Sequence, residues 1–328
     1  MGVKRKIKVD NGENAIFMCD AFSEFLAEKA SQNLVEKTLN NYAKSYEYFI
    51  EFEFDGNDEI DIATVQKIYV QHWVADMLKQ GKRATTINRY LRDIRTFLYW
   101  CMDIDRQYLN TYKIELVKGQ EELPKIFTTE EVLLLLQKPT NQKDFVEWRN
   151  WAIVNWVLGT GNRASTICNV KIGDIDFDTK RIILRHTKNK KAQVLPILSS
   201  TMEKAIKLYI KKCRSGKYVT SDSYLFPSVE EVQLTYNALA HSFSKYCKER
   251  NVEHTNIHGL RHYFATEWAK NNGGDGDRLQ IILGHSDYTM TKRYIKLSTE
   301  DLTTGGLDCT PLDKINVKKR HKKVVEMK

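Results

Sequence analysis

The chain has 328 residues, of which 42% are hydrophobic, with only 16 Gly and 5 Pro. This composition predicts a globular protein of about two domains and excludes collagen-like, linker-like and wholly disordered chains. No apolar run approaches the ~18 residues of a membrane span, and the basic start has no apolar stretch behind it, so neither membrane association nor a secretory signal is predicted. Six scattered cysteines without CxxC pairs favour reduced thiols and a cytoplasmic protein over a disulfide framework.

The net charge of +9 is concentrated at the two ends of the chain. Seven basic residues stand against one acidic residue at positions 314–328, and four against one at positions 1–10. The body between these ends is neutral. The charge is therefore compatible with nucleic-acid binding without establishing it, because basic ends are equally typical of solvated tails.

The first half of the chain has a helical pattern. After a basic arm at 1–13, apolar residues recur at helical spacing over 15–30, 34–54, 62–80 and 84–102, with turn signals at Gly56 and Gly81. Residues 14–117 therefore predict a four-helix bundle. The polar stretch at 118–126 has no period and predicts an interdomain linker.

Residues 127–306 predict a second domain, mostly α with one small sheet. The capping-box patterns Thr128–Glu131 and Ser200–Glu203 predict two helix starts, and a helix over 143–158 is expected to end at Gly159-Thr160-Gly161. Residues 182–184 and 194–197 flank a lysine-rich turn and predict a β-hairpin. Further helices are predicted over the ranges 230–250, 258–271, 278–283 and 290–297.

Several polar residues of this second domain are ordinary when taken singly. His258 and Arg261 are spaced to share a helix face, and His285 follows a helix stop at Leu283-Gly284. Such residues are usually surface or capping groups, and a lysine in a turn is usually solvated.

Their order and spacing are specific. Gly159-Thr-Gly-Asn-Arg163 is followed by a hairpin with Lys188, then by His258-Gly-Leu-Arg261-His-Tyr-Phe-Ala-Thr266, Leu283-Gly284-His285 and, nine residues later, Tyr294. This set resembles the tyrosine recombinase family, which includes the phage integrases and Xer-like proteins, over roughly residues 14–310. The resemblance implies a two-domain DNA clamp, made of a helical core-binding (SAM-like) domain and a catalytic domain.

The resemblance also implies a function and a site. The protein would be a site-specific recombinase, an integrase or transposase of a mobile element or an Xer-like enzyme. It would cleave and rejoin double-stranded DNA through a covalent 3′-phosphotyrosine and a Holliday junction, as a homotetramer on two sites, without metal, ATP or cofactor. An accessory DNA-bending or directionality protein is a further candidate partner. The implied catalytic residues are Arg163 and Arg261 on the phosphate, Lys188 as general acid, His258 assisting as general base, His285 as a donor to the phosphate, and Tyr294 as nucleophile.

Two departures and two alternatives accompany this interpretation. Thr166 stands where the family usually has an acidic residue that orients the site, and Asn162 stands where an apolar residue is common.

A type IB topoisomerase-like enzyme would share the chemistry, and a catalytically silent DNA-binding relative would share the fold. Metal-dependent nuclease chemistry is disfavoured, because the chain has no carboxylate cluster of two-metal type and its lone cysteines do not complete a zinc site. In the tail at 307–328, the apolar residues at 307–317 indicate a segment that is either disordered or docked, and the resemblance implies docking on a neighbouring subunit. The basic residues beyond them predict phosphate contacts.

Overall fold

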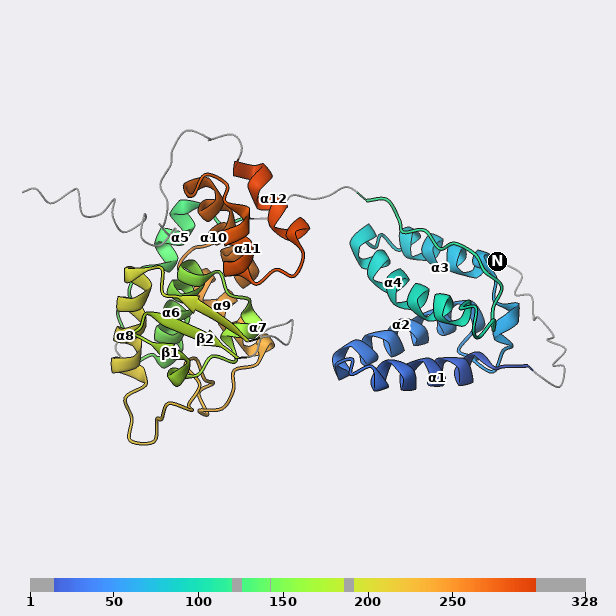
Figure 1. Ribbon diagram of the computed structural model, residues 1–328, viewed down its shortest axis with the longest axis horizontal. Helices are drawn as coiled ribbons and strands as arrows, with labels where there is room; N and C mark the ends of the chain where they lie inside the picture. Colours follow the sequence, from blue (N-terminus) through green and yellow to red (C-terminus); the bar gives the residue numbers. More distant parts are fainter. Residues whose placement is uncertain (1–14, 120–125, 142, 186–191, 299–328) are drawn as a thin grey trace, which may run out of the picture. The chain divides into compact units, whose positions relative to one another are not determined.

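The computed structural model describes residues 15–119, 126–141, 143–185 and 192–298. The chain divides into two compact units, Met1–Glu122 and Leu123–Lys328 (Figure 1). The predicted basic arm, most of the predicted linker, Lys188 and the tail from 307 onward lie outside the described residues. The predicted domain limits therefore remain predictions.

The N-terminal unit is a bundle of four helices, as predicted. They are α1 (Met18–Ser31), α2 (Glu36–Phe54), α3 (Lys67–Lys79) and α4 (Ala84–Cys101), with a 3-10 turn, η1 (Ile62–Thr64), between α2 and α3. The single helix predicted over 62–80 is wrong. Asp61 caps η1 by accepting from the backbone N–H of Ala63, and Val65 and Gln66 are then extended, so the helix restarts at Lys67.

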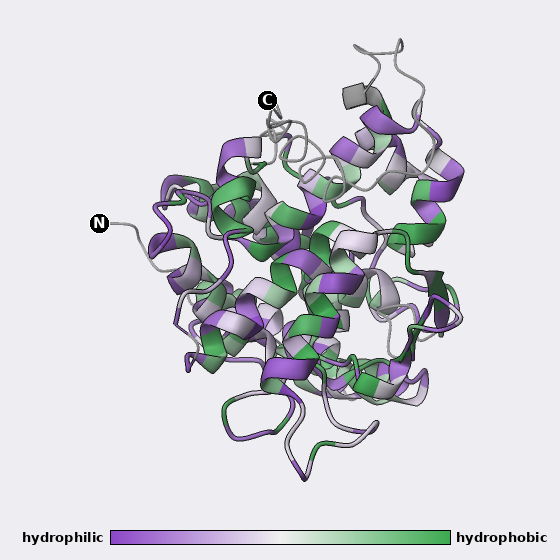
Figure 2. Cartoon of the chain, turned by 90° about the vertical axis from the view of Figure 1, so that its left-hand side faces the viewer, coloured by the Kyte–Doolittle hydropathy of each residue, from purple (hydrophilic) through white to green (hydrophobic). Residues whose placement is uncertain are grey.

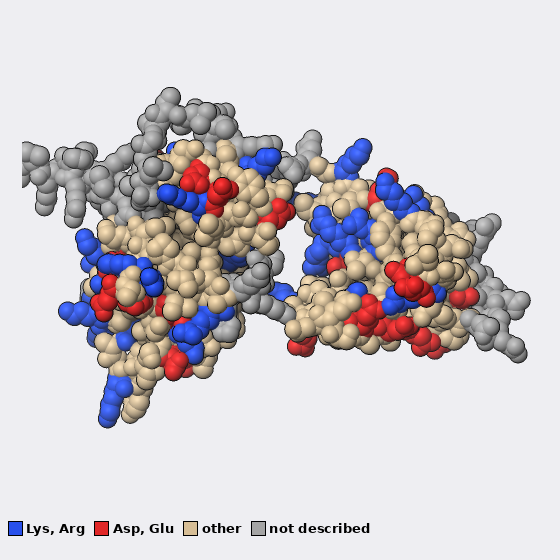
Figure 3. All heavy atoms as spheres, viewed as in Figure 1, with Lys and Arg blue, Asp and Glu red and all other residues tan. Residues whose placement is uncertain are grey.

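Aromatic rings form the centre of this bundle. Phe22 stacks on Tyr46 with ring centroids 3.9 Å apart and meets Phe97 edge-on at 5.1 Å. Helix α4 buries Ile87, Leu91, Ile94 and Phe97 on one face and leaves Arg89 and Arg92 exposed on the other. In Figure 3, Lys and Arg side chains gather over α4, whereas Asp and Glu gather on the side of α1.

The C-terminal unit surrounds one deeply buried helix, α6 (Phe145–Thr160), whose residues from Trp148 to Thr160 are all buried. A three-stranded antiparallel sheet in the order β1-β2-β3 is formed by β1 (Ile175–Asp176), β2 (Arg181–Leu184) and β3 (Gln193–Pro196), with Ile182 opposite Leu195. The predicted hairpin is confirmed, and β1 is an addition to it. The remaining elements are α5 (Thr129–Leu135), α7 (Ala164–Ile167), η2 (Ile172–Asp174), α8 (Ser200–Cys213), α9 (Tyr236–Lys248), α10 (Ile257–Asn271), α11 (Gly276–Leu283) and α12 (Tyr288–Ser298).

Figure 1 shows α10, α11 and α12 grouped at one end of this unit, where they pack on one another. Hydrophobic and hydrophilic residues alternate along the outer helices in Figure 2, as expected for helices that bury one face. Within the described part of the chain, no helix has the length and apolar character that crossing a membrane requires.

The helix ends were predicted with mixed success. The capping box of Thr128 and Glu131 is confirmed, and Gly161 ends α6 at φ +64°. The predicted cap at Ser200 is wrong, because its neighbour Ser199 is extended and accepts from the N–H of Met202. This register packs Met202 against Gly159 of α6, where a β-carbon would lie 2.5 Å from the sulfur. Helix α9 begins six residues later than predicted, at the Thr235 cap.

Candidate active site

Arg163 is positioned by the end of the buried helix α6. Gly161 turns the chain in the left-handed region, and a β-carbon there would lie 2.5 Å from the ring of Phe264, so only glycine fits. Arg163 is then extended, directly precedes α7 and is half-buried. Its Nη1 lies 3.3 Å from each of the carbonyl oxygens of Leu283 and Gly284, at the end of α11. The turn after α6 thus directs this guanidinium toward α11.

Arg261 reaches the same place from α10. Its side chain is buried, with 6% of the residue exposed. Nη1 donates to the carbonyl of Gly161 at 2.6 Å, and Nη2 donates to the carbonyl of Leu283 at 2.9 Å. Burial, and then the charge of Arg163, lower the pKa of Arg261 to about 9, so the group still carries its charge at neutral pH. Two guanidinium groups, one from the turn after α6 and one from α10, therefore meet at the carbonyl oxygen of Leu283.

His285 follows Gly284, which ends α11 at φ +60°. Its Nε2 lies 2.9 Å from Nη2 of Arg261, and its Nδ1 lies 2.9 Å from the hydroxyl of Thr291 in α12. Burial, followed by the charges of Arg261 and Arg163, lowers the pKa of His285 to about 4. The imidazole is therefore neutral and fixed between an arginine and a buried hydroxyl.

Tyr294 lies on α12, one turn after Thr291, so the two residues share a helix face. It is buried, and its hydroxyl lies 2.8 Å from Nδ1 of His262 in α10. Its ring stacks beside that of His285, with centroids 6.4 Å apart and an interplanar angle of 16°. The residue predicted as nucleophile is thus in contact with the histidine that touches Arg261.

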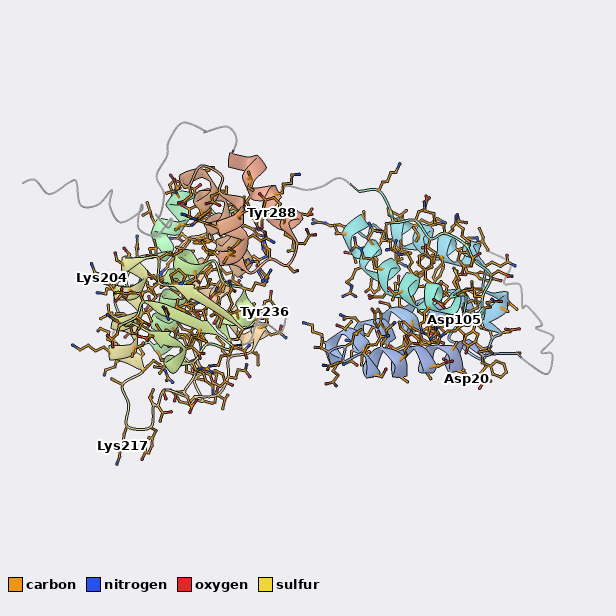
Figure 4. All side chains as sticks on the ribbon, in the orientation of Figure 1. Asp20, Asp105, Lys204, Lys217, Tyr236 and Tyr288 are labelled. Atoms are coloured by element: carbon orange, nitrogen blue, oxygen red, sulfur yellow. The ribbon has the colours of Figure 1, made fainter. Side chains whose placement is uncertain are left out.

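His258 lies in the first turn of α10, whose N-terminus is capped by Asn256. His258 is three residues before Arg261, so the two side chains share a face of α10. Burial, followed by the positive charges of Arg261 and Arg163, lowers the pKa of His258. The exposed ring of Tyr236, labelled at the edge of the unit in Figure 4, lies 6.1 Å from that of His258. His258 therefore belongs to the same cluster, on its accessible side.

Lys188 lies outside the described residues, between β2 and β3. The first residue of β3, Gln193, donates through its side-chain amide to the carbonyl of Ile281 in α11, and its Oε1 faces Gly284. The base of this hairpin is therefore hydrogen-bonded to the C-terminal end of α11, where Arg163 and Arg261 also donate to backbone carbonyls.

Five of the six predicted residues are thus brought together by α6, α10, α11 and α12. Sequence reasoning missed His262 and Thr291, although each has a spacing signal: His262 is four residues after His258, and Thr291 is three before Tyr294.

The departure at Asn162 has a structural reason, because its buried side chain accepts from the indole N–H of Trp156 at 2.9 Å. Thr166 is buried in α7. Among the described residues, no three His, Cys, Asp or Glu side chains are grouped as metal ligands would be.

Comparison with known families identifies both units. Residues 125–301 match the model of the phage integrase family, and residues 20–103 match the phage integrase N-terminal SAM-like domain. The chain belongs to the phage integrase family. As a member, it is a tyrosine-type site-specific recombinase, an enzyme that cleaves and rejoins DNA.

Xer proteins are among the relatives of this recombinase. It is 26% identical over 288 residues to tyrosine recombinase XerC of Lacticaseibacillus casei, which covers 86% of this chain and 94% of that protein. It is 31% identical over 232 residues to tyrosine recombinase XerD of Chlamydia trachomatis, covering 68% of this chain and 74% of the relative.

Solved structures share the fold. An integrase of the Tn1549 transposon in complex with circular intermediate DNA superposes with a TM-score of 0.69, at 20% identity, over 93% of this chain and 100% of the other. A lambda integrase tetramer bound to a Holliday junction gives a TM-score of 0.66 at 15% identity, over 86% of this chain and 78% of the other.

Proposed function

We propose that this recombinase cleaves DNA by attack of Tyr294 on a phosphodiester held by Arg163 and Arg261. One observation carries the proposal. The two guanidinium groups converge on the carbonyl oxygen of Leu283, at 3.3 and 2.9 Å, beside the histidine that stacks on Tyr294. A phosphate oxygen is an acceptor of the same kind with a full negative charge, so the convergence supports a phosphate site.

The chemistry of phosphodiester cleavage requires these residue types. Negative charge gathers on the nonbridging oxygens in the transition state, and arginine offers planar, permanently charged donors to two oxygens at once. Because the donors are held in advance by α6, α10 and α11, little reorganisation is needed when charge develops.

The proposed step forms one bond and breaks another. The Tyr294 phenol gives its proton to a histidine of the cluster as its oxygen bonds to phosphorus. The bond from phosphorus to the 5′-oxygen breaks, and Lys188 donates a proton to that oxygen. The product is a 3′-phosphotyrosine, which keeps the energy of the broken bond. Attack by a 5′-hydroxyl reverses the step and rejoins DNA, so strand exchange requires no nucleotide hydrolysis.

The two histidines near the arginines have distinct places in this proposal. His258 lies on the accessible side of the cluster beside exposed Tyr236 and shares a helix face with Arg261, where we expect a bound phosphate to lie near its ring. His285 is buried and accepts from Arg261 through Nε2. It becomes a donor to the phosphate only when it is protonated or when the other nitrogen turns toward the DNA.

We further propose that the N-terminal unit binds the same duplex through α4, so that the two units form a clamp, and that four copies assemble on two DNA sites. Support for DNA binding by α4 comes from its exposed arginines, Arg89 and Arg92, and from the basic surface in Figure 3. Support for the assembly comes from the lambda integrase tetramer, which is bound to a Holliday junction.

Replacing Tyr294 by Phe tests the nucleophile, because it keeps the ring and removes only the hydroxyl. A suicide substrate with a nick near the cleavage site traps the covalent protein–DNA adduct. The variant should bind this DNA as the wild type does and form no adduct. An adduct that persists in Tyr294→Phe would show that another residue is the nucleophile.

A further inference from the structure

The Tyr294 hydroxyl is hydrogen-bonded to His262, whereas the sequence analysis predicts His258 as the general base. Its oxygen lies 2.8 Å from Nδ1 of His262, and the two rings are 5.8 Å apart at an angle of 40°. This is the distance of a hydrogen bond between a phenol and a ring nitrogen. The sequence assigns the base role to His258, in the first turn of the same helix.

Helix α10 explains how His262 comes to this place. His262 directly follows Arg261 and is four residues, about one turn, after His258, so the two imidazoles share one face of the helix. It is only half-buried. Burial, followed by the positive charges of His258 and Arg261, lowers the pKa of His262. A neutral ring has a lone pair on one nitrogen, and Nδ1 accepts from the phenol when Nε2 carries the hydrogen.

We propose that His262 is the general base for Tyr294, which rests on the proposed function of Tyr294 as nucleophile. Nδ1 takes the phenol proton while the oxygen bonds to phosphorus, and Lys188 supplies the proton of the departing 5′-oxygen. During rejoining, the imidazolium of His262 returns its proton to the departing phenol. Charge is conserved in the step, because His262 gains the phenol proton, Lys188 loses a proton to the 5′-oxygen, and the phosphodiester keeps a single negative charge. The negative charge that gathers on the phosphate also favours an imidazolium beside it.

Contact with the reacting oxygen supports this role. A general base must lie within about 2.6–3.2 Å of the atom whose proton it removes. Phenol has an ordinary pKa of about 10, so attack at neutral pH gains from a neutral imidazole at that distance. An opposing role would be a restraint, in which His262 keeps Tyr294 away from the phosphate until DNA is bound.

Two substitutions separate a base from a hydrogen-bond partner. His262→Asn places an amide oxygen where Nδ1 lies, so the acceptor is kept and proton uptake is lost, whereas His262→Ala removes both. His241→Asn is the matched control, because His241 is exposed on α9. The rate of adduct formation is measured with saturating enzyme on the nicked suicide substrate. Both His262 variants should slow it by roughly 10²–10⁴-fold, and the control should not change it.

A more acidic phenol provides the decisive test. When 3,5-difluorotyrosine replaces Tyr294, the nucleophile needs less help from a base, so the defect of His262→Asn should shrink by at least tenfold. An undiminished defect would overturn the base role in favour of positioning. Faster cleavage by His262→Asn or His262→Ala would overturn it in favour of a restraint, and unchanged cleavage would overturn it outright.

The failure of this inference is distinguishable from failure of the proposed function. Tyr294→Phe reports on the nucleophile independently of His262. Binding of the same DNA by each His262 variant, together with an unchanged melting temperature, shows that folding and phosphate recognition are intact.

Discussion

Nη2 of Arg261 lies 2.9 Å from Nε2 of His285. A guanidinium has no acceptor, so the arginine donates and His285 holds a lone pair on Nε2. Its hydrogen is then on Nδ1, which donates to the Thr291 hydroxyl at 2.9 Å. Arg261 thereby fixes the tautomer of the histidine that the sequence predicts as a donor to the phosphate.

Thr291→Val should slow strand cleavage by about tenfold or more without abolishing DNA binding. The substitution leaves the buried Nδ1–H of His285 without its acceptor, which costs about 1–3 kcal/mol and lets the ring and its tautomer change. Single-turnover adduct formation measures the effect. Thr291→Ser keeps the hydroxyl and should retain most of the wild-type rate; an equal defect in both variants would contradict the role of the hydroxyl.

Stability should fall as the pH is lowered from 6.5 toward 4. Folding lowers the pKa of His285 from 6.5 to about 4, so in this interval the unfolded chain binds a proton there and the folded chain does not. The lowered pKa values of His258 and His262 act in the same direction. Urea unfolding followed by tryptophan fluorescence at several pH values measures the slope.

His285→Gln cannot take up a proton and should therefore show a smaller loss of stability between pH 6.5 and 4 than the wild type. His72→Gln is the control, because His72 is exposed on α3. Identical slopes for His285→Gln and the wild type would show that His285 does not contribute.

Lys188→Ala should slow cleavage of ordinary DNA by about a hundredfold or more, since it removes the proposed general acid. A substrate with sulfur in place of the 5′-bridging oxygen should largely restore the rate, because sulfur leaves without protonation. Equal defects on the two substrates would assign Lys188 to positioning instead.

Gln193→Ala should reproduce part of the Lys188 defect. Gln193 attaches the base of the hairpin to Ile281 at the end of α11, so its loss should displace Lys188 while leaving both arginines in place. We expect slower cleavage of ordinary DNA and rescue by the same sulfur substrate. Gln233→Ala, on the loop before α9, is the matched control. A Gln193 defect that the sulfur substrate does not rescue would place the effect at the phosphate site.

Truncation at Thr304 should leave a protein that binds a single half-site but assembles and exchanges strands poorly. The prediction rests on the apolar residues at 307–317, which a lone chain gains little by exposing. Gel shift and strand-exchange assays measure the two activities. Full recombination by the truncated protein would exclude docking of the tail on a neighbouring subunit.

The sequence by itself determined the class of the fold and most of the candidate site. Helical periodicity predicted the bundle, and the hairpin was predicted by two short apolar runs around a lysine-rich turn. Arg261, His285 and Tyr294 were identified as candidate site residues because their motifs and spacing resemble those of the tyrosine recombinases, and helical periodicity alone would not have selected them. The end of α6 at Gly161 was predictable as well, since glycine adopts the left-handed conformation at low cost.

Tertiary structure decided what local signals left undetermined. Ser199 and Ser200 have equal capping chemistry, and the choice between them depends on the packing of Met202 against α6. The hydrogen bond from Tyr294 to His262 joins residues 32 positions apart, and it depends on how α12 packs on α10. No periodicity along one helix reports such a contact, because the crossing of two helices is set by side chains from both. The identity of the imidazole that touches the nucleophile is therefore a property of the packed domain.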